Sequence, residues 1–171
     1  MGFKVSTISK DNSTGFTRRR ALAALSAAAF SDQAVAGRPP RVLFVCQSGT
    51  VKSPFARELA RREAQRRKLA ALFRSRGLAI EDHVSPRLAA ALEADGIDLG
   101  RKKARRLTDE DLRWADLLVA FDPTPAPPRG KLTLDWSDTP SLNDRYAEAR
   151  ALIERRLGAL LTEIAGGAYR R

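Results

Sequence analysis

The sequence VLFVCQSGTVKSP occupies residues 42–54. Its first four residues form a continuous apolar run that ends at a turn, which is typical of a strand buried on both faces of a parallel sheet. Pro54 suits the first position of a helix, and Ser53 suits the capping position before it. The sequence therefore predicts that a strand over 42–45 passes through a tight turn directly into a helix.

The rest of the chain alternates predicted strands and helices in the order β-α-β-α-α-β-β-α. Apolar runs, capping residues and Gly or Pro breakers set the boundaries. The predicted strands cover 42–45, 69–73, 116–121 and 132–134, and the predicted helices cover 54–68, 86–94, a short segment opened by Thr108, and a long segment that begins at Asn143 or Asp144 and ends near Glu163. This order predicts an α/β fold, a small doubly wound domain whose ligand site lies at the carboxyl ends of its strands.

The composition limits the kind of protein this is. The chain has 171 residues, of which 43% are apolar and 30% charged, as expected of a single globular domain. No apolar run approaches the roughly 18 residues that a membrane span needs. The single cysteine excludes an internal disulfide framework, and the single histidine argues against a Cys/His zinc cluster. We therefore expect no membrane span, no metal and no cofactor.

The formal net charge is +11, from 31 Lys and Arg against 20 Asp and Glu, which favours acidic partners through the long-range field. One cluster of this charge lies on the predicted exposed side of the helix over 54–68, at Arg57, Arg61, Arg62, Arg66, Arg67 and Lys68. A basic helix face of this kind is more often a solvated surface than a nucleic-acid site. We expect no nucleic-acid partner.

Residues 1–36 have the features of a targeting segment. Consecutive arginines at 18–20 precede a short apolar segment over 21–30, and the sequence Ala-Val-Ala follows at 34–36. A basic region, an apolar region and an A-x-A ending are the three parts of an export signal, and the arginines point to the twin-arginine route. An amphipathic helix or a disordered arm is the alternative. The predicted organisation is a targeting segment or arm over 1–36 and a folded domain over 37–171, with a periplasmic location if the segment is an export signal and a cytoplasmic location otherwise.

Cys46 follows the first predicted strand and opens the loop into the helix. Backbone N–H groups of a tight turn that enters a helix point inward and form a nest that suits a tetrahedral oxyanion, and the same field favours a nucleophilic thiolate. Gly49 permits a left-handed turn, Lys52 places a cation six residues after the cysteine, and the Ser53 hydroxyl can hydrogen-bond the sulfur. Singly these residues are weak evidence, because a cysteine after an apolar strand is most often an inert core residue. Their conjunction indicates an anion-binding loop.

Residues 42–58 resemble the phosphate-binding loop of the low-molecular-weight protein tyrosine phosphatases and their arsenate reductase relatives, whose pattern is C-x5-R-S-P. The resemblance extends to Ser75-Arg76-Gly77, which is similar to the family's S-A-G turn, to residues 92–98, which resemble its helix ending in G-I-D, and to residues 115–119, which resemble its A-D-x-I-V strand. It covers about residues 41–165. The fold it implies is phosphotyrosine protein phosphatase I-like, a four-stranded parallel sheet flanked by helices.

The resemblance also implies a hydrolase, a protein phosphatase that works in two steps. Cys46 attacks the phosphorus in line, Asp138 protonates the leaving phenolate, and water activated by Asp138 hydrolyses the phosphocysteine. The implied oxyanion-binding residues are Lys52 and the loop residues Gln47, Ser48, Gly49, Thr50, Val51 and Ser53. Trp136 either lies beside the substrate ring at the pocket mouth or anchors the final helix in the core. The implied substrate is phosphotyrosine in a protein, or another aryl phosphate.

Three departures from the family pattern bear on activity. Lys52 stands where the family has arginine, and lysine lacks the planar fork that grips two phosphate oxygens, so weaker transition-state stabilisation is expected. Gly49 stands where the family has asparagine, which keeps the turn but removes a side chain that organises the loop. The family's acid is an aspartate immediately before proline in a late loop, whereas residues 135–140 here read DWSDTP. Asp138 is the predicted acid, and Asp135 is the alternative.

Two other functions remain open. An arsenate reductase would use the same loop for arsenate, but the single cysteine excludes an internal cysteine relay, so an external small thiol or a redoxin would be needed. Export would separate such a reductase from its reductant. The third hypothesis is a non-catalytic descendant that binds phosphate or a phosphorylated partner, and Lys52 is the feature that supports it. The expected partner is therefore a phosphorylated protein or a small phosphate or arsenate oxyanion.

Overall fold

The structure is a computed structural model that describes residues 37–82, 84–99, 103–125 and 131–169. The predicted targeting segment over 1–36 lies outside the described residues, so its export role and the periplasmic location stay predictions. Among the described residues, no helix combines the length and the apolar character needed to cross a membrane. The same residues contain no group of three or more His, Cys, Asp or Glu side chains arranged to hold a metal ion.

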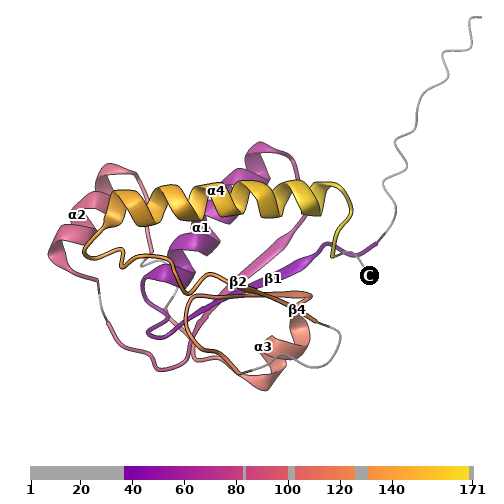
Figure 1. Cartoon of the computed structure of the whole chain (residues 1–171), viewed down its shortest axis with the longest axis horizontal. Helices are drawn as coiled ribbons and strands as arrows, with labels where there is room; N and C mark the ends of the chain where they lie inside the picture. Colours follow the sequence, from indigo (N-terminus) through magenta and orange to yellow (C-terminus); the bar gives the residue numbers. More distant parts are fainter. Residues whose placement is uncertain (1–36, 83, 100–102, 126–130, 170–171) are drawn as a thin grey trace, which may run out of the picture. The chain divides into compact units, whose positions relative to one another are not determined.

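The helices and strands follow the predicted order (Figure 1). They are β1 (Arg41–Cys46), α1 (Lys52–Arg66), β2 (Leu72–Gly77), α2 (Pro86–Ala94), α3 (Asp109–Trp114), β3 (Leu117–Ala120), β4 (Leu132–Asp135) and α4 (Tyr146–Ala165). The strands form one sheet in the order β2-β1-β3-β4, and every neighbouring pair is parallel. The predicted α/β fold with a four-stranded parallel sheet is confirmed.

The register of β1 places the start of the predicted anion loop at one edge of the sheet. Cys46 pairs with Gly77 at the end of β2, and on the other side Val45 pairs with Ala120 at the end of β3. Because all strands run parallel, their carboxyl ends meet at the same edge, where ligands bind in sheets of this kind. The loop after Cys46 therefore begins at the edge where a site is expected.

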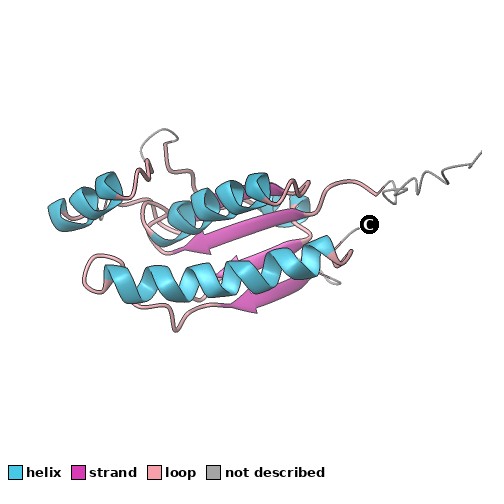
Figure 2. Cartoon of the chain, turned by 90° about the horizontal axis from the view of Figure 1, so that it is seen from above, coloured by secondary structure: helices cyan, strands magenta, loops and turns pink. Residues whose placement is uncertain are grey.

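β1 divides its side chains between two cores. Val42 and Phe44 belong to the larger core, which α1, α2 and α4 share. Leu43 and Val45 belong to a smaller core that α3 covers through Leu112. Figure 1 shows α4 and α3 on opposite sides of the strands, and Figure 2 shows α4 running alongside them. Burial on both faces is the reason why this strand reads as an unbroken apolar run.

The second strand differs from its predicted position over 69–73. β2 begins at Leu72 and includes Ser75-Arg76-Gly77, which the sequence analysis placed after the strand. Lys68 has a φ of 53°, and the Leu69 N–H donates to the Ala64 carbonyl (2.8 Å), so these residues end α1 instead of beginning a strand. Pairing along the whole of β1 then carries β2 to Gly77.

The predicted helix caps have different outcomes. Thr108 caps α3 as predicted, because its hydroxyl accepts the Asp111 N–H (3.3 Å). The prediction that Ser53 caps the first helix is wrong, since α1 begins at Lys52 and its N-cap is Val51. The Ser53 hydroxyl is therefore available to the loop.

The predicted cap of the long last helix is also wrong. The N-cap of α4 is Arg145, and no side chain accepts a hydrogen bond there. The side-chain oxygen of Asn143 instead accepts the Ser85 N–H (3.0 Å), which connects the segment before α4 to the start of α2. Tertiary contact has overridden the local capping preference of Asn143.

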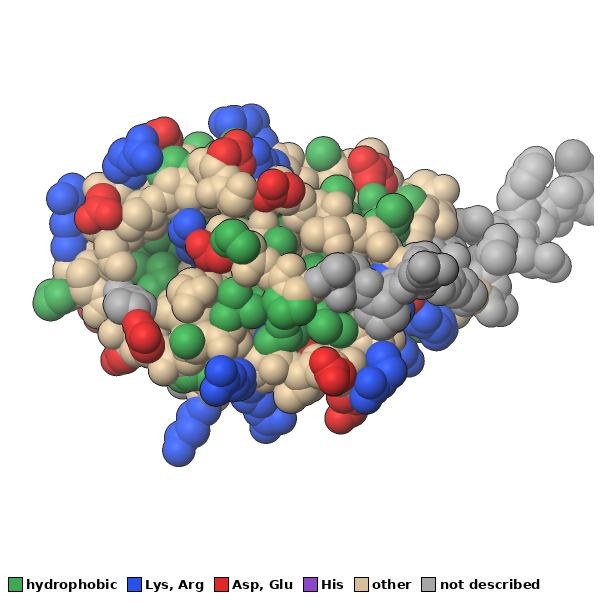
Figure 3. Space-filling view, turned by 60° about the horizontal axis from the view of Figure 1, so that its bottom comes forward, with side chains coloured by type: hydrophobic (Ala, Val, Ile, Leu, Met, Phe, Trp, Pro, Cys, Tyr) green, Lys and Arg blue, Asp and Glu red, His purple; other side chains and the backbone are tan. Residues whose placement is uncertain are grey.

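Charged side chains of both signs are interspersed on the face drawn in Figure 3. On α1, Glu58 pairs with Arg61 (3.6 Å) and Arg62 (3.1 Å), which are ordinary pairs of a solvated helix. The prediction that Arg57 shares this exposed side is wrong, because Arg57 is only 9% exposed. The remaining basic face of α1 has the features of a solvated surface.

Asp111 connects α3 to β2 through a buried ion pair. Its carboxylate accepts hydrogen bonds from Arg76 (2.6 Å), Arg74 (3.3 Å) and the Thr108 hydroxyl (3.0 Å). Burial acts to raise the pKa of this carboxyl, but the hydrogen bonds from Arg76 and Thr108 and the charge of Arg76 hold the pKa below its usual value. The ionised carboxylate therefore stabilises the folded state.

This ion pair predicts a pH-dependent stability. The unfolded pKa of an aspartate is about 3.9, so the stabilisation is complete above that value and is lost as the pH falls through the lower folded pKa. We expect Asp111→Asn to reduce the free energy of unfolding at pH 7 by about 2 kcal/mol, and to have a smaller effect at pH 2, as measured by urea unfolding. The exposed pair between Asp138 and Arg156 provides the control, and Asp138→Asn should leave stability unchanged. Equal losses for Asp111→Asn at both pH values would contradict the ionic explanation.

Candidate active site

Residues 46–53 form a tight loop between β1 and α1. Gly49 has a φ of +71°, the left-handed conformation predicted for this position. A Cβ atom built on Gly49 would lie 2.8 Å from the Cα and N atoms of Gly77. The two glycines therefore pack backbone against backbone, which holds the loop against the end of β2.

The Cys46 sulfur lies at the floor of this loop and is only 2% exposed. It accepts N–H groups from Gly49 (3.3 Å) and Ser53 (3.4 Å). The thiol donates to the Ser53 hydroxyl (3.1 Å), which in turn donates to the Arg76 carbonyl (3.0 Å). Two amides and a hydroxyl thus surround the sulfur. The amides of the loop are not turned away from the sulfur, as they would be around an inert core cysteine.

A cavity of about 190 Å³ opens beside the sulfur. It is lined by Cys46, Gln47, Ser48, Val51 and Lys52 of the loop, by Asp122, and by Ser141, Leu142 and Asn143. The backbone N–H groups of Ser48, Val51 and Lys52 have no hydrogen-bond partner among the described residues, and Lys52 is also the first residue of α1. Unpaired amides at a helix N-terminus, together with a lysine, provide the setting that a small tetrahedral anion requires.

Asp122 is a residue of this cavity that the sequence analysis missed. It follows β3, the strand next to β1, and its carboxylate accepts the Gln47 N–H (2.8 Å). This bond fixes the backbone immediately after Cys46. The sequence did contain a signal for this residue. Asp122 is an aspartate at the carboxyl end of a predicted strand, and Pro123 follows it directly.

The comparison with known proteins identifies the family. The family model for low molecular weight phosphotyrosine protein phosphatase matches residues 41–127, just over half of the chain. The chain belongs to this family. The match begins at β1 and includes the whole anion loop, Asp122 and the strands on both sides of β1.

Solved structures show the same phosphatase fold. The structure of YfkJ from Bacillus subtilis is 20% identical, with a TM-score of 0.63 over 78% of this chain and 99% of that chain. A thioredoxin-dependent arsenate reductase of Corynebacterium glutamicum is 26% identical, with a TM-score of 0.61 over 78% of this chain and 65% of that chain. The tyrosine phosphatase Wzb of Escherichia coli, in complex with sulphate, is 22% identical, with a TM-score of 0.57 over 72% of this chain and 97% of that chain. No curated protein matches the sequence.

The late loop does not bring the predicted acid to the sulfur. Asp138 lies outside the residues that line the Cys46 cavity, is 67% exposed, and pairs with Arg156 (2.7 Å), a hydrogen bond that lowers its pKa. Asp135, the alternative, accepts the Ser137 N–H (2.8 Å), which also lowers its pKa. Asp135 also lies outside the residues that line the Cys46 cavity, so neither carboxylate is placed beside the sulfur.

Trp136 lies in the larger core and not at the mouth of the cavity. It is 5% exposed and packs edge-on against Phe121, with ring centroids 5.7 Å apart, and against Phe44 at 6.2 Å. Arg156 of α4 lies over its ring. This placement favours the interpretation of Trp136 as a core anchor over that of a substrate contact.

The remaining predicted loop residues divide between two sides of the loop. Gln47, Ser48 and Val51 line the cavity that contains Cys46. Thr50 does not, because its hydroxyl donates to the Glu81 carbonyl (2.7 Å), and it lines a second cavity on the opposite side. The structure therefore brings the predicted nucleophile Cys46, the cation Lys52 and part of the predicted binding set together around one cavity, with Asp122 as the carboxylate among its described residues.

Proposed function

We propose that the chain is a cysteine-dependent phosphomonoesterase that hydrolyses phosphotyrosine or another aryl phosphate through a phosphocysteine intermediate. The supporting observation is the Cys46 sulfur, which accepts two backbone N–H groups at the edge of a cavity of about 190 Å³. The chain belongs to the phosphatase family and has an arsenate reductase among its structural neighbours, which supports either phosphate-ester hydrolysis or arsenate reduction. A phosphocysteine needs only water to regenerate the enzyme, which suits a chain with a single cysteine.

The proposed reaction has two displacements at phosphorus. The Cys46 thiolate attacks opposite the leaving oxygen, so that an S–P bond forms as the P–O bond breaks and the leaving oxygen takes a proton from an acid. Water then attacks the phosphocysteine, the S–P bond breaks, and inorganic phosphate leaves. The unpaired amides of the loop and the Lys52 ammonium stabilise the negative charge on the equatorial oxygens in both steps.

We propose Asp122 as the proton donor, in place of the Asp138 expected from the family. Asp122 lines the cavity beside Cys46, whereas Asp138 is paired with Arg156 outside it. One oxygen of Asp122 is bound by the Gln47 amide, which leaves the other oxygen for a substrate. The backbone bond also fixes the direction of the carboxyl group.

A comparison of leaving groups separates proton donation from loop anchoring. We expect Asp122→Asn to reduce kcat/KM for phenyl phosphate about 100-fold, and to have much less effect on 2,4-dinitrophenyl phosphate, whose leaving group needs no proton. Asp138→Asn should change neither rate more than twofold. Steady-state kinetics of the wild type and both variants give kcat/KM for each of the two substrates. An equal loss on both substrates would assign Asp122 to loop anchoring, and a selective loss in Asp138→Asn would restore Asp138 as the donor.

The lysine of the loop should limit the rate. Lys52 offers a point charge where a guanidinium offers a planar fork to two phosphate oxygens. We expect Lys52→Arg to raise kcat about 10-fold, because the added contacts form to the transition state. The matched control is Lys103→Arg, on a residue that does not line the Cys46 cavity and should have no effect. A fall in kcat for Lys52→Arg would show that the loop is adapted to lysine.

Arsenate reduction is the second candidate, favoured by the 26% identity to a thioredoxin-dependent arsenate reductase. Here Cys46 would form an S–As bond as arsenate loses water. An external thiol would then attack that sulfur, giving a mixed disulfide while arsenic(V) leaves as arsenite(III), and a second external thiol would reduce the disulfide. Turnover in arsenate with thioredoxin and its reductase, followed by NADPH oxidation, tests this route.

The phosphatase proposal is tested by trapping its intermediate. The full chain is mixed with p-nitrophenyl phosphate, quenched in acid within milliseconds, and examined by mass spectrometry. A phosphate adduct on Cys46, with burst release of p-nitrophenol, is the expected result. Binding of phosphate without an adduct or turnover would support the non-catalytic alternative. If the protein showed no phosphate binding and no turnover, the proposal would be overturned.

A further inference from the structure

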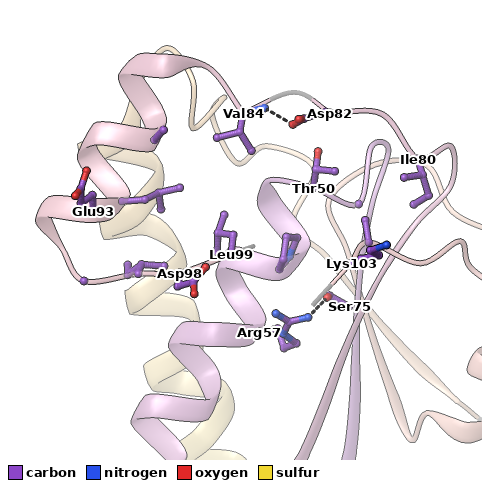
Figure 4. Close-up of a pocket in the computed structure, with 17 residues that line it drawn as sticks. Thr50, Arg57, Ser75, Ile80, Asp82, Val84, Glu93, Asp98, Leu99 and Lys103 are labelled. Atoms are coloured by element: carbon purple, nitrogen blue, oxygen red, sulfur yellow. Dashed lines mark hydrogen bonds between the residues drawn. The ribbon is translucent and has the colours of Figure 1, made fainter. Parts of the chain in front are cut away.

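A second cavity, of about 920 Å³, lies on the side of the anion loop that faces α2 (Figure 4). Gly49 and Thr50 of the loop form part of its wall, and Cys46 does not line it. Its apolar lining includes Ile80, Val84, Leu92, Ile97 and Leu99. A cavity of this size and apolar character is large enough for a small organic ligand.

Among the described residues, Arg57 is a buried cation of this cavity without a counter-ion. Arg57 lines it and is only 9% exposed, and its Nη1 donates to the Ser75 hydroxyl (2.8 Å). Its Nε is buried without any hydrogen-bond partner, and no described carboxylate pairs with the guanidinium. Burial lowers the pKa of Arg57, which reflects the cost of holding this charge away from water. Buried charges are normally paired, so Arg57 lacks, among the described residues, the anionic partner that a buried guanidinium usually has.

A second cation lies on the same side of the cavity. Lys103 lines it close to Ser75 and Arg57, as Figure 4 shows, and forms no ion pair with a described residue. The lining also contains the carboxylates of Asp82, Glu93 and Asp98. The three carboxylates outnumber the two cations, which disfavours a phosphate dianion in this cavity. A singly charged head group must therefore be placed at Arg57 and Lys103, which are the two cations of the lining.

We infer that this cavity binds a small amphiphilic monocarboxylate, whose carboxylate pairs with Arg57 and whose apolar body lies along Val84, Leu92 and Ile97. The carboxylate supplies a counter-charge for the Arg57 guanidinium, and Lys103 adds a second positive charge to the lining of the same cavity. The apolar body removes the exposed hydrophobic lining from water. This inference does not depend on the proposed phosphatase function, since no residue of the Cys46 cavity takes part.

Octanoate tests the inference, with octanol as the uncharged analogue of the same apolar body. Isothermal titration of the full chain should give octanoate binding that weakens at least about 10-fold in Arg57→Met, the effect expected from losing one charge-assisted pair. Arg61→Met, one turn further along α1 and exposed, is the matched control and should bind as the wild type. Octanol should bind weakly and equally to all three proteins. Equal octanoate affinity in Arg57→Met, or octanol binding as tight as octanoate, would overturn the inference.

Two further measurements keep the test decisive. Inorganic phosphate should not displace octanoate, and Cys46→Ser should bind it unchanged, since displacement or loss would place the carboxylate in the anion loop and overturn the inference. Removing an unpaired buried charge should not lower the melting temperature of Arg57→Met. If that variant does not fold, Lys103→Met provides the same test at an exposed position, with binding expected to weaken severalfold and unchanged binding counting against the inference.

Discussion

Replacing Cys46 with serine is expected to reduce kcat/KM for p-nitrophenyl phosphate by about 1000-fold or more, to the background rate in buffer. The serine hydroxyl fits the same space, but a neutral hydroxyl is a far weaker nucleophile than a thiolate. The unpaired N–H groups of Ser48, Val51 and Lys52 remain, so phosphate binding should persist. Steady-state hydrolysis and phosphate titration measure the two properties separately.

The variant also separates the competing functions. Loss of turnover with retained phosphate binding identifies Cys46 as the nucleophile of a phosphatase. Equal rates in wild type and Cys46→Ser would remove the enzyme hypothesis, whatever the phosphate affinity. Loss of both properties together with a lower melting temperature would show a folding defect, for which Cys46→Ala provides the second test.

Restoring the family's asparagine at position 49 is expected to damage this protein. A Cβ atom on Gly49 would meet the backbone of Gly77 at 2.8 Å, closer than carbon atoms approach without displacement. We expect Gly49→Asn to lower the free energy of unfolding by about 3 kcal/mol, from overpacking and left-handed strain together, and to abolish hydrolysis because the loop moves off its anion. Urea unfolding and the phosphatase assay measure the two effects.

Gly96 provides the matched control for this substitution. It also has a positive φ, of +61°, but nothing lies within 4 Å of the position a Cβ atom would take. Gly96→Asn therefore carries only the cost of the left-handed backbone, about 1 kcal/mol, and should leave activity intact. Similar losses at both positions would show that backbone strain, and not the contact with Gly77, makes Gly49 necessary.

The fold could be predicted where the local sequence preference and the tertiary packing favour the same secondary structure. The run of Val42 to Val45 is apolar because β1 is buried on both faces, so its position was predictable from sequence. The position of β2 was not, because pairing with β1 sets its register and the residues after α1 have similar apolar character. The prediction of the α4 cap was wrong because of a tertiary contact as well: the Asn143 side chain accepts a hydrogen bond from Ser85, which is far away in the sequence.

The residues of the loop itself could be predicted from the sequence, whereas the residues that other elements bring to the site could not. Cys46, Lys52 and the loop glycine are close in sequence, so their spacing carried the information. Asp122 joins the site only because β3 lies next to β1, a neighbour relation that no local pattern encodes. Arg57 was assigned to the exposed side of its helix because composition does not reveal which arginine faces a cavity.

One residue of β2 connects the two sides of the sheet. The Arg76 side chain is bound by Asp111 of α3, while its carbonyl accepts the Ser53 hydroxyl that contacts the Cys46 sulfur. The surroundings of the Cys46 sulfur thus depend on α3, a helix that contributes no described residue to the cavity lining. A mutational scan scored only by turnover should therefore recover sensitive positions on α3, remote from any substrate, and these would be misread as a second binding surface unless the Arg76 connection were taken into account.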